Sequence, residues 1–196
     1  PLNDLFWRFD MRRLSAEEIR DSVLSVAGNL NLKQGGPSVF PELPEEVLAT
    51  SSQPNRVWGY SPPEEANRRS IYVKVKRSLL VPILNQFDMA DTDSTCAVRF
   101  VTTVPTQSLT MLNGKFINQQ AQDFARRIRK YGGSTLNQQL KYGLELVLSR
   151  QPSNEEIYWA NDFIDTLVND EQVQLDIALD RFALLALNLN EFIFLD

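Results

Sequence analysis

Apolar residues recur at helical spacing near the start of the chain, in the segment LSAEEIRDSVLSVAGNL. Ser15 and Glu18 have the spacing of a capping box, in which each side chain satisfies a backbone N–H at the start of a helix. Ile19 and Val23 then begin an apolar stripe, and Gly28 follows the last turn as a typical helix end. This pattern predicts the first helix of the protein.

The second half of the chain has the same periodicity, interrupted by proline and glycine. Pro105 suits the first turn of a helix, and Gly114 is a candidate break within that helix. Ser153 and Glu156 form another capping box directly after the short connection RQPS, so the helices on either side of it should form an αα-hairpin. We expect helices over residues 105–130, 134–149, 153–168 and 170–187.

Between these regions the helical pattern is lost. Prolines and glycines interrupt residues 29–67, where we expect an ordered loop region with a short helix near Glu45. In SIYVKVKRS, Ile71, Val73 and Val75 alternate with polar residues. That period of two predicts a short strand with one buried face.

These elements together predict a mainly α fold of about five main helices, with a long ordered loop region and at most a short β element. A length of 196 residues, with 43% hydrophobic and 23% charged residues, is typical of a folded globular protein. We expect a monomer with a single domain over 1–196. Its parts are a first helix region, a loop-rich region with a short strand and a C-terminal helical bundle, over 1–28, 29–100 and 101–196.

Residue types that are rare in the chain exclude several chemistries. It has no histidine and one cysteine, which excludes catalytic triads with histidine, histidine-ligated zinc and disulfides within the chain. Its apolar runs fall far short of the roughly 18 residues of a membrane-spanning helix. The chain begins with Pro1 rather than methionine, and we expect it to be part of a longer protein.

The stretch FDMADTDSTCAVRF, residues 87–100, is a candidate metal site because it holds three carboxylates close in sequence: Asp88, Asp91 and Asp93. The spacing resembles the start of a calcium-binding EF-hand loop. However, Cys96 and Thr102 occupy the positions where that loop needs glycine and glutamate. The favoured interpretation is a turn held by its own side chains, with Arg99 paired to a carboxylate.

The same stretch contains the only thiol. Cys96 could act as a nucleophile if Arg99 lowered its pKa. A free cysteine more often packs as a small buried side chain. We therefore predict that Cys96 is structural and reacts slowly with thiol reagents.

Two further surfaces have alternative interpretations. The basic run RRSIYVKVKR could follow a nucleic-acid backbone, but a net charge of −5 argues against such a partner and favours a solvated strand face. Four aromatic residues could form a sugar-binding platform, although aromatic residues normally fill cores. They are Trp7, Trp58, Tyr60 and Trp159.

Charge is distributed unevenly along the chain. Residues 151–196 hold ten carboxylates and one base, Arg181, for a net charge of −9, whereas residues 1–150 carry +4. The favoured interpretation is two solvated helix faces that partly meet basic segments within the fold. The alternative is an acidic surface that docks a positively charged partner. Its candidate residues are Asp162, Asp165, Asp176 and Asp180.

Seven short motifs occur in one order along nearly the whole chain. They are WRFDMRRLSAEEIRD, GGPSVFP, RRSIYV, FDMADTDSTCAVRF, TTVPTQSLTMLN, LSRQPSNEE and LNLNEFIFLD. Together they closely resemble the planctomycete-specific C-terminal domain of unknown function that has number 1553 in its series. The resemblance implies the last part of a large exported bacterial protein, located in the periplasm or cell envelope. A cytochrome-c-like module often precedes this domain, and no catalytic residues are assigned in it.

The favoured functional hypothesis is a non-catalytic scaffold or docking module of such a secreted multidomain protein, associated with electron transfer by its neighbours. No cofactor is expected in this chain, and haem is expected only elsewhere in the parent protein. The expected partners are other domains of the parent, including a cytochrome-like module, and not nucleic acid. The alternative is an enzyme domain that acts on polysaccharide through paired carboxylates.

Overall fold

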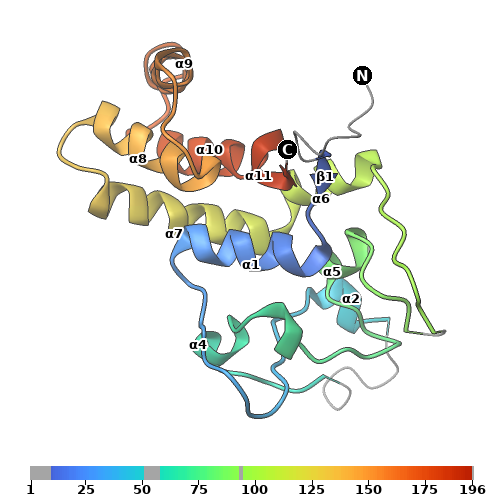
Figure 1. Cartoon of the computed structure of the whole chain (residues 1–196). Coiled ribbons are helices and arrows are strands. Elements are labelled where there is room, and N and C mark those ends of the chain that lie inside the picture. The colour runs from blue at the N-terminus through green and yellow to red at the C-terminus, as the bar shows by residue number, and fades with distance from the viewer. Residues whose placement is uncertain (1–9, 51–57, 93–94, 196) are drawn as a thin grey trace. The chain divides into compact units, whose positions relative to one another are not determined.

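The computed structural model describes residues 10–50, 58–92 and 95–195. Over these residues the protein is mainly α-helical with a single two-stranded sheet, which confirms the predicted fold class. It forms two compact units, whose elements are labelled in Figure 1. The loop unit is Ser15–Gln120, and the helical unit combines Pro1–Leu14 with Ala121–Asp196. The single domain over 1–196 stays a prediction.

The loop unit begins with the predicted first helix, α1 (Ala16–Ala27). Both halves of its capping box are present, because Ser15 Oγ accepts from the Glu18 N–H and the Glu18 carboxylate accepts from the Ser15 N–H. Gly28 ends the helix in the left-handed conformation with φ 82°, as a glycine cap requires. The buried side of α1, including Ile19 and Val23, packs against α5 (Pro82–Gln86).

The rest of the loop unit contains short helices joined by ordered connections. They are α2 (Glu45–Leu48), α4 (Pro63–Ala66), the 3-10 helix η1 (Ser70–Tyr72) and α6 (Pro105–Asn113). The predicted helix near Glu45 is confirmed as α2.

The predicted strand at residues 71–76 is wrong. Ser70 donates from both its N–H and its hydroxyl to the Asp21 carboxylate, at 2.7 Å each, and the chain turns there into η1. Val73 is buried, but Ile71 and Val75 are exposed, so the three residues do not share a face. Isolated bridges, one of them between Val39 and Val73, replace the strand.

The break predicted within the long central helix is confirmed. Gly114 adopts extended angles, φ −63° and ψ 130°, and separates α6 from α7 (Lys115–Tyr131). A Cβ at this glycine would lie 2.5 Å from the carbonyl oxygen of Thr110. A larger residue would therefore be strained there. The boundary between the two units lies within α7.

The helical unit contains the predicted αα-hairpin. Its elements after α7 are α8 (Leu136–Leu148), α9 (Asn154–Asp165), the π-helix η2 (Thr166–Asp170), α10 (Leu175–Ala186) and α11 (Asn190–Ile193). The capping box of Ser153 and Glu156 starts α9 as expected. The final long helix begins at Leu175 rather than near Asp170, because η2 continues the chain beyond α9 before a turn at Gln172, which has φ 54°.

One glycine in the core of this unit allows three helices to pack closely. Gly143 lets α8 pack closely against both α7 and α10. A Cβ at this position would lie 2.8 Å from Ile128 Cδ1 on α7 and 3.3 Å from the Phe182 ring on α10. Strand β1 (Arg12–Arg13) pairs antiparallel with β2 (Phe194–Leu195).

Among the described helices, none combines the length and the apolar character that a membrane crossing requires.

A charged cluster joins the α8–α9 connection to the last helix of the helical unit. Arg150 lies 2.6 Å from the Glu156 carboxylate and 2.7 Å from that of Glu191 on α11. The hydrogen bond from Arg150 lowers the pKa of Glu156 to about 2, from an ordinary value of 4.5. This ion pair therefore makes stability depend on pH.

Replacing Arg150 by alanine should flatten the acid limb of the stability profile. A carboxyl group with a lowered folded-state pKa stabilises the protein fully above its unfolded value, and the stabilisation is lost as the pH falls. For Glu156 that window lies between pH 4.5 and about 2. Melting temperatures across this window should fall less steeply in Arg150→Ala than in the wild type. Arg181→Ala, which removes an exposed arginine 3.5 Å from Glu171, should keep the wild-type slope. An unchanged slope in Arg150→Ala would contradict this assignment.

Candidate functional site

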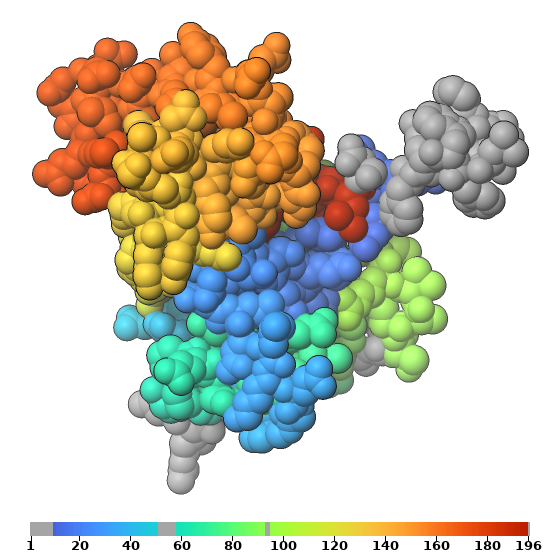
Figure 2. Space-filling view, turned by 60° about the vertical axis from the view of Figure 1, so that its left-hand side comes forward, coloured from blue at the N-terminus to red at the C-terminus, as the bar shows by residue number. Residues whose placement is uncertain are grey.

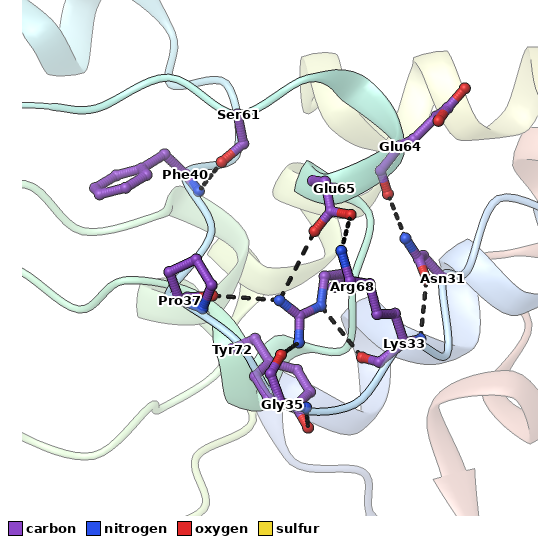
Figure 3. Close-up of polar contacts among 10 residues, drawn as sticks. All are labelled: Asn31, Lys33, Gly35, Pro37, Phe40, Ser61, Glu64, Glu65, Arg68 and Tyr72. Carbon is purple, nitrogen blue, oxygen red and sulfur yellow. Dashed lines mark hydrogen bonds and ion pairs between the residues drawn. The ribbon is translucent and has the colours of Figure 1, made fainter.

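A buried arginine organises the loop region of the loop unit (Figure 3). Arg68 has 0% relative exposure. Its guanidinium donates to the carbonyl oxygens of Lys33 and Pro37, at 3.2 Å each, and to that of Gly35. One planar side chain therefore fixes three backbone positions of a single loop, in an arrangement that lysine cannot reproduce.

Side chains complete the surroundings of this guanidinium. The Glu65 carboxylate lies 3.8 Å from it, and the ring of Tyr72 lies under it at 3.9 Å. The Tyr72 hydroxyl accepts from the Gly35 N–H at 3.0 Å, so it holds the same loop from a second point. Lys33 lies 2.7 Å from Glu65, and their hydrogen bond lowers the pKa of that carboxyl group.

A second buried arginine connects this region to α1. Arg20 donates to the carbonyl oxygens of Arg68 and Ala66, at 3.0 and 2.8 Å, and to the Ser70 hydroxyl at 3.2 Å. Burial lowers the pKa of Arg20 to about 10, and the charge of Asp21 acts in the opposite direction. Arg20 therefore stays charged at neutral pH.

Three of the motifs that carry the family resemblance meet at these two arginines: WRFDMRRLSAEEIRD, GGPSVFP and RRSIYV. The interpretation of the basic run as a solvated strand face is wrong at Arg68, which is buried. The guanidinium of Arg68 is occupied by the protein itself, so this cluster is a structural clamp and not a ligand site. The hydropathy pattern could not identify this clamp, because the main acceptors of Arg68 are backbone carbonyls, which every residue has.

Two side chains of the stretch with the three aspartates tie it to neighbouring parts of the fold. Asp88 has φ 61°, and its carboxylate accepts from the N–H and the hydroxyl of Thr102, at 2.8 and 3.0 Å. Arg99 donates to both carboxylate oxygens of Glu17 on α1, at 2.6 and 3.0 Å. Burial is the strongest single influence and acts to raise the pKa of Glu17, but the bond to Arg99, a backbone hydrogen bond and the charge of Arg99 together leave that pKa lowered. The interpretation as a side-chain-bonded turn is confirmed at Asp88 and Arg99.

Of the three candidate metal ligands, the structure describes Asp88 and Asp91. The Asp88 carboxylate is used by Thr102, and Asp93 lies outside the described residues. In the part of the chain that the structure describes, no group of three carboxylates or thiols is arranged to hold a metal ion. Metal binding that involves Asp93 stays an untested alternative.

Instead, the second half of this stretch presents apolar side chains to solvent. We call residues 95–104 the apolar loop. Phe100 is 85% exposed and Val98 is 74% exposed, and Val101 is exposed as well. Cys96 is also exposed, and its thiol donates to the Val98 carbonyl at 3.4 Å. The prediction of a buried cysteine is therefore wrong, because Cys96 lies in a run of exposed residues, 95–104.

The four candidate acidic residues lie on two helices. Asp162 and Asp165 are exposed on α9. Asp176 and Asp180 on α10 lie 3.5 and 3.7 Å from Arg129, at the end of α7. Burial raises the pKa of Asp180, and the charge of Arg129 opposes that change.

Two of the four aromatic residues of the candidate platform, Trp58 and Trp159, make separate contacts. Trp58 donates from Nε1 to the Pro41 carbonyl at 2.8 Å and packs edge-on against Phe40. Trp159 stacks on Phe163 in α9, with ring centroids 6.2 Å apart. Trp7 lies outside the described residues.

The fold and these surfaces define a mainly α-helical protein with an arginine-clamped loop region and an exposed, anchored apolar loop. The chain belongs to the PSD1 family, described as "Protein of unknown function (DUF1553)", whose model matches residues 1–164. This match confirms the family expected from the motifs. No curated protein and no solved structure matches the chain.

Proposed function

We propose that this chain is a non-catalytic docking module that binds another protein through its apolar loop. The observation that carries the proposal is the exposure of Phe100, at 85%, within a loop that two anchors hold in place. The first anchor is the bond between Asp88 and Thr102 of the loop. The second is the bond between Arg99 of the loop and Glu17 on α1.

The position of Arg99 explains how the loop presents its apolar residues. Its guanidinium is turned toward α1, where it makes two hydrogen bonds with Glu17. The residues on either side of it, Val98 and Phe100, are both exposed. Apolar side chains held in water cost free energy that association with a partner would recover, and an ordered loop loses less entropy on binding.

The partner that fits this loop is a protein surface with an apolar pocket, because buried aromatic residues dominate the energetics of protein interfaces. We propose that the partner is another domain of the same exported parent protein, as the family resemblance implies, and that it is met in the periplasm or cell envelope. Any redox chemistry, including that of a cytochrome-like module, then belongs to the partner.

The carboxylates with lowered pKa values give the enzyme alternative no comparable support. Glu17, Glu65 and Glu156 each bond to a cation within the fold, with Arg99, Lys33 and Arg150 as their partners. A carboxylate held in this way stays ionised and acts as a structural anion, not as a proton donor.

Replacing Phe100 by serine should weaken binding to the remaining domains of the parent protein by about tenfold or more, as the loss of an interface anchor does. Isothermal titration calorimetry of the purified chain with those domains measures the change. The matched control is Leu32→Ser, since Leu32 is a large apolar residue of the same unit with 68% exposure on a different loop. The control should keep wild-type affinity, and both variants should keep the wild-type melting temperature. Equal affinity of the two variants would contradict the proposal.

A further inference from the structure

The outward side of α9 in the helical unit carries exposed aromatic rings and carboxylates. Tyr158 is 73% exposed at its centre. Residues three, four and seven positions apart on a helix share one face. Three exposed carboxylates therefore share its face: Glu155 and Asp162 about one turn from Tyr158, and Asp165 about two turns further along.

The opposite side of the helix fixes this orientation. Ala160 and Ile164 are buried, and α9 packs through that side against α8, η2 and α10. Trp159 lies at the edge of the outward side, stacked on Phe163 with an interplanar angle of 23°. Figure 2 shows the orange residues of this region exposed over a broad face of the helical unit. The backbone that presents this surface is therefore fixed by packing before any partner arrives.

The charge of this surface is not neutralised by bases on its own helix. The sequence of α9, NEEIYWANDFID, contains no lysine or arginine. The nearest arginine in sequence, Arg150, bonds to Glu156 and Glu191 rather than to the outward carboxylates. Arg129 lies beside Asp176 and Asp180 on α10.

We propose that the α9 face, defined as Glu155, Tyr158, Trp159, Asp162 and Asp165, binds an arginine-rich segment of a partner protein. A guanidinium stacks on an aromatic ring and at the same time donates to a neighbouring carboxylate. Tyr158 offers such a ring, with Asp162 one turn further along the helix and Glu155 nearly one turn before it. A face that served only solubility would need the carboxylates but not the exposed rings.

The α9 face and the apolar loop of the proposed function belong to different units. The apolar loop lies in the loop unit and the α9 face in the helical unit. The apolar loop selects a partner by hydrophobic burial, whereas the α9 face selects basic side chains. Failure of one proposal therefore leaves the other intact.

The test is titration of the purified chain with a hexa-arginine peptide, at low ionic strength and at about 0.15 M salt, where the screening length is about 8 Å. We expect saturable binding that weakens with salt. Asp162→Asn combined with Asp165→Asn should weaken it about fivefold, in line with two exposed ion pairs. Tyr158→Ser should weaken it about threefold, through loss of the cation–π contact.

Two control variants separate this site from general attraction to an acidic protein. Glu45→Gln combined with Glu46→Gln removes the same charge from exposed positions on α2. Tyr131→Ser removes a tyrosine that is 61% exposed on α7. Both controls should change the affinity less than twofold. Equal weakening by the controls and the α9 variants, or no binding at low salt, would overturn the proposal.

Discussion

Arg68→Ala should lower the free energy of unfolding by about 3–5 kcal/mol, the cost of breaking a buried, fully engaged charge network. The substitution leaves three loop carbonyls without their common donor, on Lys33, Gly35 and Pro37. It also uncovers the face of the Tyr72 ring. Chemical denaturation followed by circular dichroism measures the loss.

The neighbouring arginine provides a matched control for this prediction. Arg69 is exposed and lies 3.5 Å from the Asp21 carboxylate. Exposed ion pairs contribute at most about 1 kcal/mol, so Arg69→Ala should change stability by no more than that. Arg68→Lys should also be destabilising, because an ammonium group cannot reach three divergent carbonyls. If Arg68→Ala and Arg69→Ala had similar stability, the clamp would not hold the loop region.

Phe182→Ala should be comparably destabilising in the helical unit, with a loss of about 3–5 kcal/mol from the cavity that it leaves. Phe182 is fully buried on α10, and its ring meets α8 at Gly143. Thermal and chemical denaturation measure the effect. On the same helix, Ile177→Ala truncates a half-exposed side chain and should cost less than about 1 kcal/mol. A loss below 1 kcal/mol for Phe182→Ala would mean that this core is not packed as described.

The helices could be predicted because their signals are local. A capping box needs two residues three positions apart, and Ser15 with Glu18 and Ser153 with Glu156 both form one. Gly114 marks the break between α6 and α7 for an equally local reason, since a side chain there would collide with the preceding turn. These features depend on the adjacent backbone and not on the rest of the fold.

The loop region could not be predicted because its structure depends on contacts distant in sequence. Ser70 bonds to Asp21, 49 positions earlier, and Arg68 bonds to carbonyls more than 30 positions away. The alternation of Ile71, Val73 and Val75 predicted a strand, but these contacts override the local preference. A single sequence carries no sign of which carbonyl an arginine will reach.

The candidate sites show the same division between local and distant information. The charge asymmetry was visible in composition, but composition could not show that Arg129 approaches Asp176 and Asp180 while Asp162 and Asp165 remain exposed. Likewise, the sequence favoured burial of Cys96, whereas the anchors of its loop place it in solvent. Exposure is decided by where a loop leaves the fold.

The most direct test of docking through the apolar loop is the reaction rate of Cys96 with a thiol reagent at neutral pH. This residue is exposed, four positions before Phe100, and it is the only cysteine of the chain. We expect fast labelling in the isolated chain. In the intact longer protein that the family resemblance implies, labelling of the Cys96 peptide, followed by mass spectrometry, should be at least about tenfold slower because the partner covers the loop. Phe100→Ser should restore fast labelling there. Equal rates in the isolated chain and the intact protein would contradict docking through the apolar loop.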